Sequence, residues 1–475
     1  MKPLALQICA AAFAALLAAA APARGAGMAT NRWVRAVGKD ARASVAENWS
    51  LGHAPKRNEV ALFTARHPTA AVWDAAAPRE IGGLVLDEGY LSVVTFETTA
   101  GKPVKVDGDV DLRAGALTHP QNGDDARWSL QLRVGGSLRV GPGAIVSVTA
   151  KGFAPGKGPS PGLEPGWGAS HGGQGAPKSG GESGRPALVC GSIFEPAACG
   201  SGGTVADGAA PGIGHGGGAI RIEAGGDIEI YGAIRADGDG RNPGNVLLGG
   251  AAGGSIDLRA GGRFRWGGDF AVSADGGPAF RDGGGGGGGG RIALRASDEK
   301  SDIERCPWSG NNVFFNGVHA WGGTGDTRNR DSSRADVHIR AAPGTIYCEH
   351  SGGGRPAGGG SILVRGNHPP GLATTRLPSD KDGDATLQDA EVVLSWGAFC
   401  TLGASCTVRA LHVRSDQAGF SLNRSVLTAS EVSSGDRKHV LSESGTYRGN
   451  TDDALVPILF DGGTLVLRPY FKPAL

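Results

Sequence analysis

Short segments in which apolar and polar residues alternate make up much of the chain. Early examples are 84–86, 93–96, 104–106 and 110–112, and single or double glycines separate them. Alternation with a period of two is typical of strands that bury one face. Glycine at a corner allows the positive φ that a sharp change of direction needs. Residues 48–153 therefore predict a series of short strands joined by tight corners.

An internal repeat follows this region. Ile220 lies in an alternating segment that returns at intervals of 36 residues, around Ile256 and again around Ile292. In the first two copies a double glycine leads into a second and a third short alternating segment, and a glycine-rich loop closes each unit. One unit cannot bury its own apolar residues, whereas stacked units can. We therefore expect an all-β fold, a parallel β-helix (β-solenoid) with glycine-rich loops.

Stacking in register predicts which side chains face inward. Ile220, Ile256 and Ile292 are expected to form one buried column. The polar residues that alternate with the apolar ones should then face solvent; they are Arg221, Glu223, Asp257 and Arg259.

Changes in composition suggest how the chain is organised. Glycine, proline and serine dominate 154–218, which predicts a long excursion held by its glycines. The C-terminal part has fewer glycines and is read as further coils or a β cap, with a separate β-sandwich as the alternative. The expected regions are a signal peptide at 1–23, N-terminal β coils or a cap at 24–120, the glycine-rich β-helix at 121–345, and the C-terminal coils or cap at 346–475.

The first residues resemble a secretory signal. Lys2 precedes an apolar run from Leu4 to about Ala21, and small residues follow at the expected cleavage site. We expect export by the Sec route to the cell surface or the extracellular space, or to the periplasm. No later apolar run is long enough to span a bilayer as a helix.

Composition narrows the choice of fold and partner. Glycine supplies 84 of the 475 residues, and glycine disfavours helix interiors. A hydrophobic fraction of 40% argues against a disordered chain. The 47 basic and 46 acidic residues nearly cancel, so no basic excess indicates a nucleic-acid partner.

Six cysteines remain outside the signal, where Cys9 lies. An even number in an exported chain suggests disulfides. Six cysteines allow 15 pairings, and proximity along the chain favours Cys190–Cys199, Cys306–Cys348 and Cys400–Cys406.

Several of these segments are similar to a known protein family. Residues 48–55, Asn-Trp-Ser-Leu-Gly-His-Ala-Pro, resemble the opening of bacterial surface β-helix repeats, and 81–90 resembles the strand and turn that follow it there. Residues 170–175 and the three repeats look like the glycine-rich right-handed parallel β-helix of secreted bacterial proteins. This resemblance, over about 45–325, implies an adhesin-like or autotransporter-passenger-like surface role. We expect no C-terminal translocator barrel.

One acidic segment resembles a calcium loop. Asp380, Asp382 and Asp384 occupy positions 1, 3 and 5 of an EF-hand pattern, and Glu391 occupies position 12. Ala385 stands where such a loop needs glycine, and a polar turn before a strand is the alternative. The hypothesis is one Ca²⁺ held by these four carboxylates.

A pair of aspartates could support catalysis. Register places Asp237 and Asp275 one coil apart, near the spacing of neighbouring strands, and paired carboxylates of this kind serve glycosidases. The competing interpretation is that each Ala-Asp-Gly turn uses its carboxylate to cap backbone. We favour the structural interpretation.

Histidines and tryptophans give weaker signals. His171 and His215 adjoin double glycines and could bind a metal or act as bases, although hydrogen bonding across the coil is favoured. Trp266, Trp308 and Trp321 could stack on sugars if they are exposed.

Taken together, these patterns predict an exported structural or adhesive β-helix protein that contacts glycans. The alternatives are a β-helix polysaccharide lyase or glycoside hydrolase, and a calcium-stabilised extracellular scaffold. We expect no hydrolase or lyase activity, because no Ser/His/Asp order or metal-ligand spacing indicates a catalytic centre. No cofactor other than calcium is expected.

Overall fold

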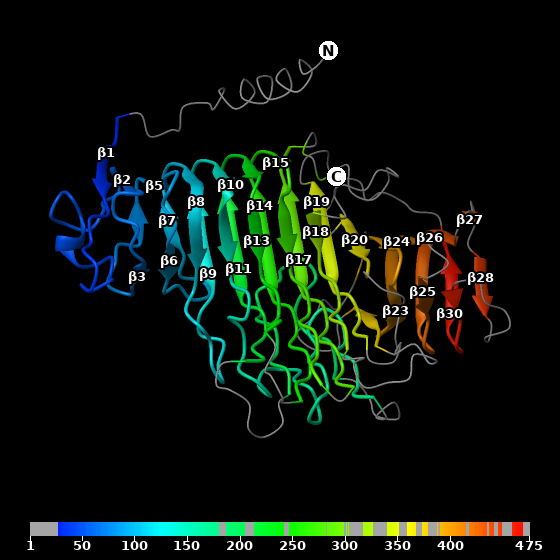
Figure 1. The fold of residues 1–475 in the computed structure, drawn as a ribbon. Coiled ribbons are helices and arrows are strands. Elements are labelled where there is room, and N and C mark those ends of the chain that lie inside the picture. Colours follow the sequence, from blue (N-terminus) through cyan, green and yellow to red (C-terminus); the bar gives the residue numbers. More distant parts are fainter. Residues whose placement is uncertain are drawn as a thin grey trace, which may run out of the picture.

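The protein is described by a computed structural model (Figure 1). It covers residues 27–468 with gaps at 180–186, 205–212, 242–246, 282, 299–300, 302, 304–316, 326–339, 351–358, 367–372, 379–386, 388–389, 415–417, 435–436, 441–444 and 449–457. The predicted signal peptide lies outside the described residues.

The described residues form an all-β fold with long, mostly parallel sheets. The first sheet has 12 strands: β1 (Ala29–Arg32), β2 (Glu59–Phe63), β3 (Ala71–Trp73), β5 (Gly83–Leu86), β6 (Val93–Phe96), β8 (Val110–Thr118), β10 (Leu138–Ser147), β12 (Ile228–Ile230), β13 (Ala233–Arg235), β15 (Phe264–Trp266), β16 (Ala271–Ser273) and β18 (Val318–His319).

The second sheet, of 14 strands, runs along the whole molecule. Its strands are β4 (Glu80–Ile81), β7 (Val104–Val106), β9 (Leu130–Val134), β11 (Ala219–Ala224), β14 (Ser255–Ala260), β17 (Arg291–Ala296), β19 (Thr345–His350), β20 (Ser361–Val364), β22 (Glu391–Leu394), β24 (Cys406–Val413), β26 (Val426–Ser434), β27 (Arg437–Val440), β28 (Gly445–Arg448) and β30 (Thr464–Leu467).

A third, four-stranded sheet contains β21 (Thr375–Leu377), β23 (Phe399–Leu402), β25 (Gly419–Ser421) and β29 (Ile458–Leu459). A short 3₁₀ turn, η1 (Ala46–Asn48), follows β1. None of the helices among these residues has the length and apolar character needed to cross a membrane.

The predicted inward column is confirmed. Ile220 pairs with Ile256 and Ile256 with Ile292, in parallel and in register, and all three side chains are buried. Leu130 extends the column on one side and Ile346 on the other. From β9 to β19 the chain alternates between the first two sheets, so the apolar faces of both sheets enclose one continuous core.

The opposite face of these strands differs from expectation at one position. Arg221, Glu223 and Arg259 are partly exposed, but Asp257 is completely buried. Its carboxylate contacts three guanidinium groups, from Arg259 at 2.9 Å, Arg295 at 3.0 Å and Arg221 at 3.7 Å. The expectation that Asp257 faces solvent is therefore wrong. The glycine-rich excursion packs over this cluster: the Phe194 carbonyl accepts a hydrogen bond from Arg295, and Glu195 forms an ion pair with Arg259.

Between β4 and β30 the direction of the long sheet reverses once. β19 and β20 pair antiparallel, and the strands from β20 onward are again parallel to one another along β22, β24, β26 and β30. At the reversal the core changes face. Ile346 packs in the first hydrophobic core, whereas its neighbour Tyr347 packs in a second core between the long sheet and the third sheet. One sheet thus supports two cores, one on each side.

Glycine-rich segments form a further layer beside the sheets, visible in Figure 1 as the coils gathered below β8 to β19. Within this layer, the backbone of 248–254 forms hydrogen bonds with at least four separate segments. The N–H groups of Gly249 and Gly250 donate to the carbonyls of Thr204 and Gly285. The carbonyls of Gly250 and Ala252 accept from the N–H groups of Ala169 and Gly217. A flat sheet gives each strand only two neighbours. The segments instead pack on several sides at distances that exclude a Cβ, as glycine does at the collagen axis.

The two ends of the long stack are built differently. At the N-terminal end, six buried aromatic residues pack together: Trp33, Trp49, Phe63, Trp73, Tyr90 and Phe96. At the far end, β27 and β28 pair antiparallel with β26 and β30 (Figure 1). The antiparallel pairs at the far end interrupt the parallel ladder, whose edge can otherwise pair with another chain.

Candidate functional site

The two candidate catalytic aspartates are adjacent. β13 and β16 pair in parallel, and the Asp275 backbone N–H donates to Asp237 Oδ1 at 2.8 Å. Ser273 Oγ donates to Asp237 Oδ2 at 3.0 Å. Asp237 thus accepts one side-chain and one backbone hydrogen bond from the next coil.

Asp275 repeats this arrangement one coil later. Its Oδ1 accepts from the Trp321 backbone N–H at 2.7 Å and contacts His319 Nδ1 at 2.8 Å. Each aspartate therefore ties its coil to the next through a side-chain group and a backbone N–H. A repeated carboxylate clamp of this kind supports a structural role for Asp237 and Asp275.

The environment of Asp237 makes the clamp sensitive to pH. Burial, followed by the Asp275 charge, raises the pKa of Asp237 to about 6 from an ordinary value of 3.8. A folded-state pKa above the unfolded one means that this group favours folding below about pH 4 and that the benefit is lost as pH rises through 6.

We therefore expect the Asp237→Asn variant to gain stability relative to wild type as the pH rises from acid to neutral. An amide keeps an acceptor for the Asp275 N–H but cannot ionise. The free energy of unfolding of the variant, compared with wild type, should rise by up to about 3 kcal/mol between pH 4 and pH 7.5. Urea titrations at both pH values measure this difference. The exposed Asp269→Asn is the control, and equal pH profiles for all three proteins would contradict the clamp.

The histidines singled out in the sequence serve the glycine-rich layer. His171 is completely buried, and its burial lowers the pKa to about 3. Its Nδ1 lies 3.3 Å from Cys190 Sγ and its Nε2 lies 3.1 Å from Ser255 Oγ. His215 Nδ1 lies 3.5 Å from the Gly152 carbonyl. Both rings bridge segments of the coil, as favoured from the sequence.

The predicted disulfides are absent from the described part of the chain. No disulfide joins Cys190 to Cys199 or Cys400 to Cys406, so the structure does not support these two predicted pairs. The sulfur atoms of the first pair contact different partners: Cys190 Sγ lies 3.3 Å from His171 Nδ1, and Cys199 Sγ lies 3.6 Å from the Asn122 amide nitrogen. Cys306 lies outside the described residues, so its pairing with Cys348 is not addressed by the structure.

The calcium hypothesis falls mainly on residues outside the described ranges, since Asp380, Asp382 and Asp384 all lie in a gap. Glu391 is described, and other groups engage both of its oxygens. Arg409 Nη2 lies 2.7 Å from Oε2, and His412 Nε2 lies 3.2 Å from Oε1. The described residues contain no group of three or more His, Cys, Asp or Glu placed to hold a metal ion.

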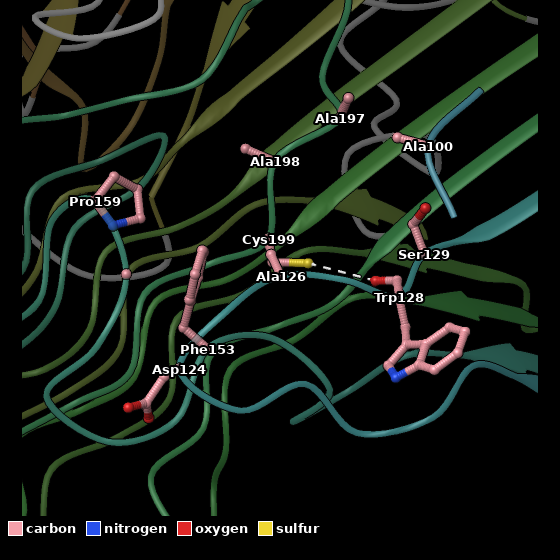
Figure 2. Close-up of a pocket in the computed structure, with 11 residues that line it drawn as sticks. Ala100, Asp124, Ala126, Trp128, Ser129, Phe153, Pro159, Ala197, Ala198 and Cys199 are labelled. Carbon is pink, nitrogen blue, oxygen red and sulfur yellow. Dashed lines mark hydrogen bonds between the residues drawn. The ribbon is translucent and has the colours of Figure 1, made fainter. Parts of the chain in front are cut away.

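A surface pocket lies where four segments distant in sequence meet. Its volume is 490 Å³, and it is lined by Ala100, Asp124, Ala126, Trp128, Ser129, Phe153, Gly158, Pro159, Ala197, Ala198 and Cys199. Figure 2 shows the Phe153 ring between Cys199 and the Asp124 carboxylate, with Pro159 to one side. The lining is mostly apolar, with a carboxylate at the rim.

Charged and polar groups set the character of this pocket. Lys157 Nζ lies 3.0 Å from Asp124 Oδ2, and the Arg127 guanidinium lies 4.4 Å from the centre of the Trp128 ring. Burial raises the pKa of the Cys199 thiol to about 12, so the sulfur stays protonated and points toward the Trp128 carbonyl. The pocket therefore offers apolar surfaces beside one ion pair and no reactive thiolate.

Sequence reasoning missed the pocket residues and selected other aromatic rings. Trp266 stacks on Phe270 at 5.3 Å, and Trp321 stacks on His319 at 3.9 Å, so both contribute to side-chain stacks on the coil. Trp308 lies outside the described residues. A tryptophan beside charged residues, at 124–128, was the signal available for the pocket.

Comparison with known proteins finds no matching family model, no similar curated protein and no similar solved structure. A proposal for the function therefore rests on the fold and on the sites described above.

Proposed function

We infer that the protein is an exported parallel β-helix that acts as a structural or adhesive component at the cell surface or in the extracellular matrix, and that it binds glycans in the pocket around Phe153. Two features support the β-helix. Successive strands alternate between sheets, and each pairs in parallel with the strand one repeat later. The apolar leader and the resemblance to bacterial surface repeats support export.

The pocket is the observation that carries glycan binding. Sugar rings present apolar C–H faces and many hydroxyl groups. The Phe153 and Trp128 side chains offer flat apolar surfaces for the C–H faces of a sugar, and the Asp124 carboxylate can accept hydrogen bonds from its hydroxyl groups. An open surface pocket of about 490 Å³ suits a short stretch of a polysaccharide.

Removing the aromatic surface should weaken glycan binding. We expect a glycan array probed with the mature protein to identify ligands, and Phe153→Ala or Trp128→Ala to weaken their binding at least about 10-fold by calorimetry, which corresponds to about 1.4 kcal/mol. Asp124→Asn should weaken binding less, because a neutral amide can still bond to hydroxyls.

The matched control is Trp396→Ala, which removes an exposed tryptophan outside the pocket. It should bind as wild type does. Binding that survives Phe153→Ala and Trp128→Ala, or that is lost with Trp396→Ala, would place the glycan elsewhere and remove the pocket from the proposal.

A further inference from the structure

Three chemistry-bearing side chains meet on the second half of the long sheet. Ser433, on β26, places its Oγ 2.7 Å from His412 Nδ1 on the neighbouring strand β24. His412 Nε2 lies 3.2 Å from Glu391 Oε1 on β22. Strand pairing aligns His412 directly beside Ser433. A hydroxyl, an imidazole and a carboxylate are thus connected in series across three adjacent strands.

The hydrogen bonds fix the roles of these groups. If Ser433 donates its O–H to His412 Nδ1, the ring must carry its proton on Nε2, and that N–H donates to Glu391. Burial alone would raise the pKa of Glu391, but the bond from His412 and the Arg409 charge lower it below its usual value. Glu391 is therefore a carboxylate that orients and polarises the ring.

The serine is more exposed than the other two groups, as nucleophilic catalysis needs. Ser433 is partly exposed, whereas the side chains of His412 and Glu391 are only 7% and 8% exposed. A reachable hydroxyl backed by a shielded base and a shielded carboxylate is the arrangement that activates serine in unrelated folds.

We propose that Ser433, His412 and Glu391 form a second functional site, which hydrolyses carboxylic esters of small acyl groups. Ser433 Oγ bonds to the ester carbonyl carbon as its proton passes to His412 Nδ1. The C–O bond to the alcohol then breaks, and the alcohol leaves with the proton from His412.

Water completes the reaction. It adds to the acyl carbon while His412 takes its proton, the bond from that carbon to Ser433 Oγ breaks, and the proton returns to Oγ as the carboxylic acid departs. Ser433 and His412 are the catalytic residues, and Glu391 is a positioning residue. This activity is independent of glycan binding in the pocket.

One neighbouring group could favour a different role. Glu431 Oε1 lies 4.0 Å from His412 Nδ1, so a protonated His412 would bridge two carboxylates as a structural ion pair. A protonated ring has no lone pair to accept the Ser433 proton. Reactivity of the serine therefore separates the two roles.

A fluorophosphonate probe tests the site in the full mature protein, because it bonds to serine Oγ when a neighbouring base activates it. We expect labelling of wild type, with the modified peptide mapped to Ser433 by mass spectrometry, and hydrolysis of p-nitrophenyl acetate. Ser433→Ala and His412→Gln should each lower the hydrolysis rate at least about 100-fold. Glu391→Gln should lower kcat more than it raises KM, and Glu391→Asp should restore part of kcat.

Two variants serve as controls. Ser430→Ala removes a serine on the same strand whose hydroxyl donates to the Arg409 carbonyl, and Phe153→Ala alters only the pocket. Both should be labelled as wild type is. Absence of label on Ser433 in the folded wild-type protein would overturn the proposal, whatever the stability of the variants, and would leave His412 as an ion-pair partner.

Discussion

Replacing Ile256 with aspartate is expected to prevent the protein from folding. Ile256 lies in the middle of the column that runs from Leu130 through Ile220 and Ile292 to Ile346, and its side chain is completely buried. A carboxylate there would lose the hydration of its charge with no cation to compensate, which costs several kcal/mol or more. Net stabilities of about 5–15 kcal/mol leave little room for such a loss. Circular dichroism and proteolysis of the purified variant measure the outcome.

A smaller change at the same position provides the control. Ile256→Val removes one methylene group and should cost about 1 kcal/mol, with the β-rich spectrum retained. A folded Ile256→Asp protein whose melting temperature matches wild type would mean that this side chain does not point into the core.

The repeat region could be predicted because one physical constraint governs it. Ile220 and Ile256 must both be buried, and a fixed interval of 36 residues is compatible with a single parallel register. The sequence did not reveal the burial of Asp257, because the residues that cover it come from the excursion about 60 residues earlier. Local alternation determines the two faces of a strand, but it cannot tell what packs on the outer one.

The reversal at β19 and β20 was beyond sequence reasoning for a related reason. Tyr347 and Ile362 face the second core, whereas Ile346 and Leu363 face the first, and both pairs are apolar. A strand buried on both faces loses the alternation that identifies an inward side. The expected C-terminal coils or cap therefore carried no indication that the core would change sides.

One candidate site could be predicted from the sequence and the other could not. The adjacency of Asp237 and Asp275 followed from register, and their clamp role from the repeated Ala-Asp-Gly turn. Glu391, His412 and Ser433 lie on neighbouring strands, but the pairing offset is 19 residues from β22 to β24 and 21 residues from β24 to β26. Without a single period, three residues so far apart in the sequence give no contiguous motif.

The second large effect is expected where the glycine-rich segments cross. A Cβ added to Gly250 would overlap the Gly277 carbonyl oxygen and the Gly287 nitrogen, which belong to two separate segments of backbone. Backbone on several sides cannot yield as a flexible side chain can. Gly250→Ala should therefore lower the free energy of unfolding by about 3 kcal/mol or more. In the unfolded chain, alanine is less flexible than glycine, which by itself would stabilise the fold by up to about 1 kcal/mol, so a loss has a clear origin.

Gly123→Ala is the matched control, because a Cβ there meets no atom within 4 Å. It should change the free energy of unfolding by no more than about 0.5 kcal/mol in urea titrations. Equal stability of the two variants would mean that the segments around Gly250 are loosely packed. The high glycine content would then reflect corners alone, since corners need positive φ but leave room for a methyl group. A large loss confined to Gly250→Ala instead ties the composition of the chain to close contact between neighbouring backbones.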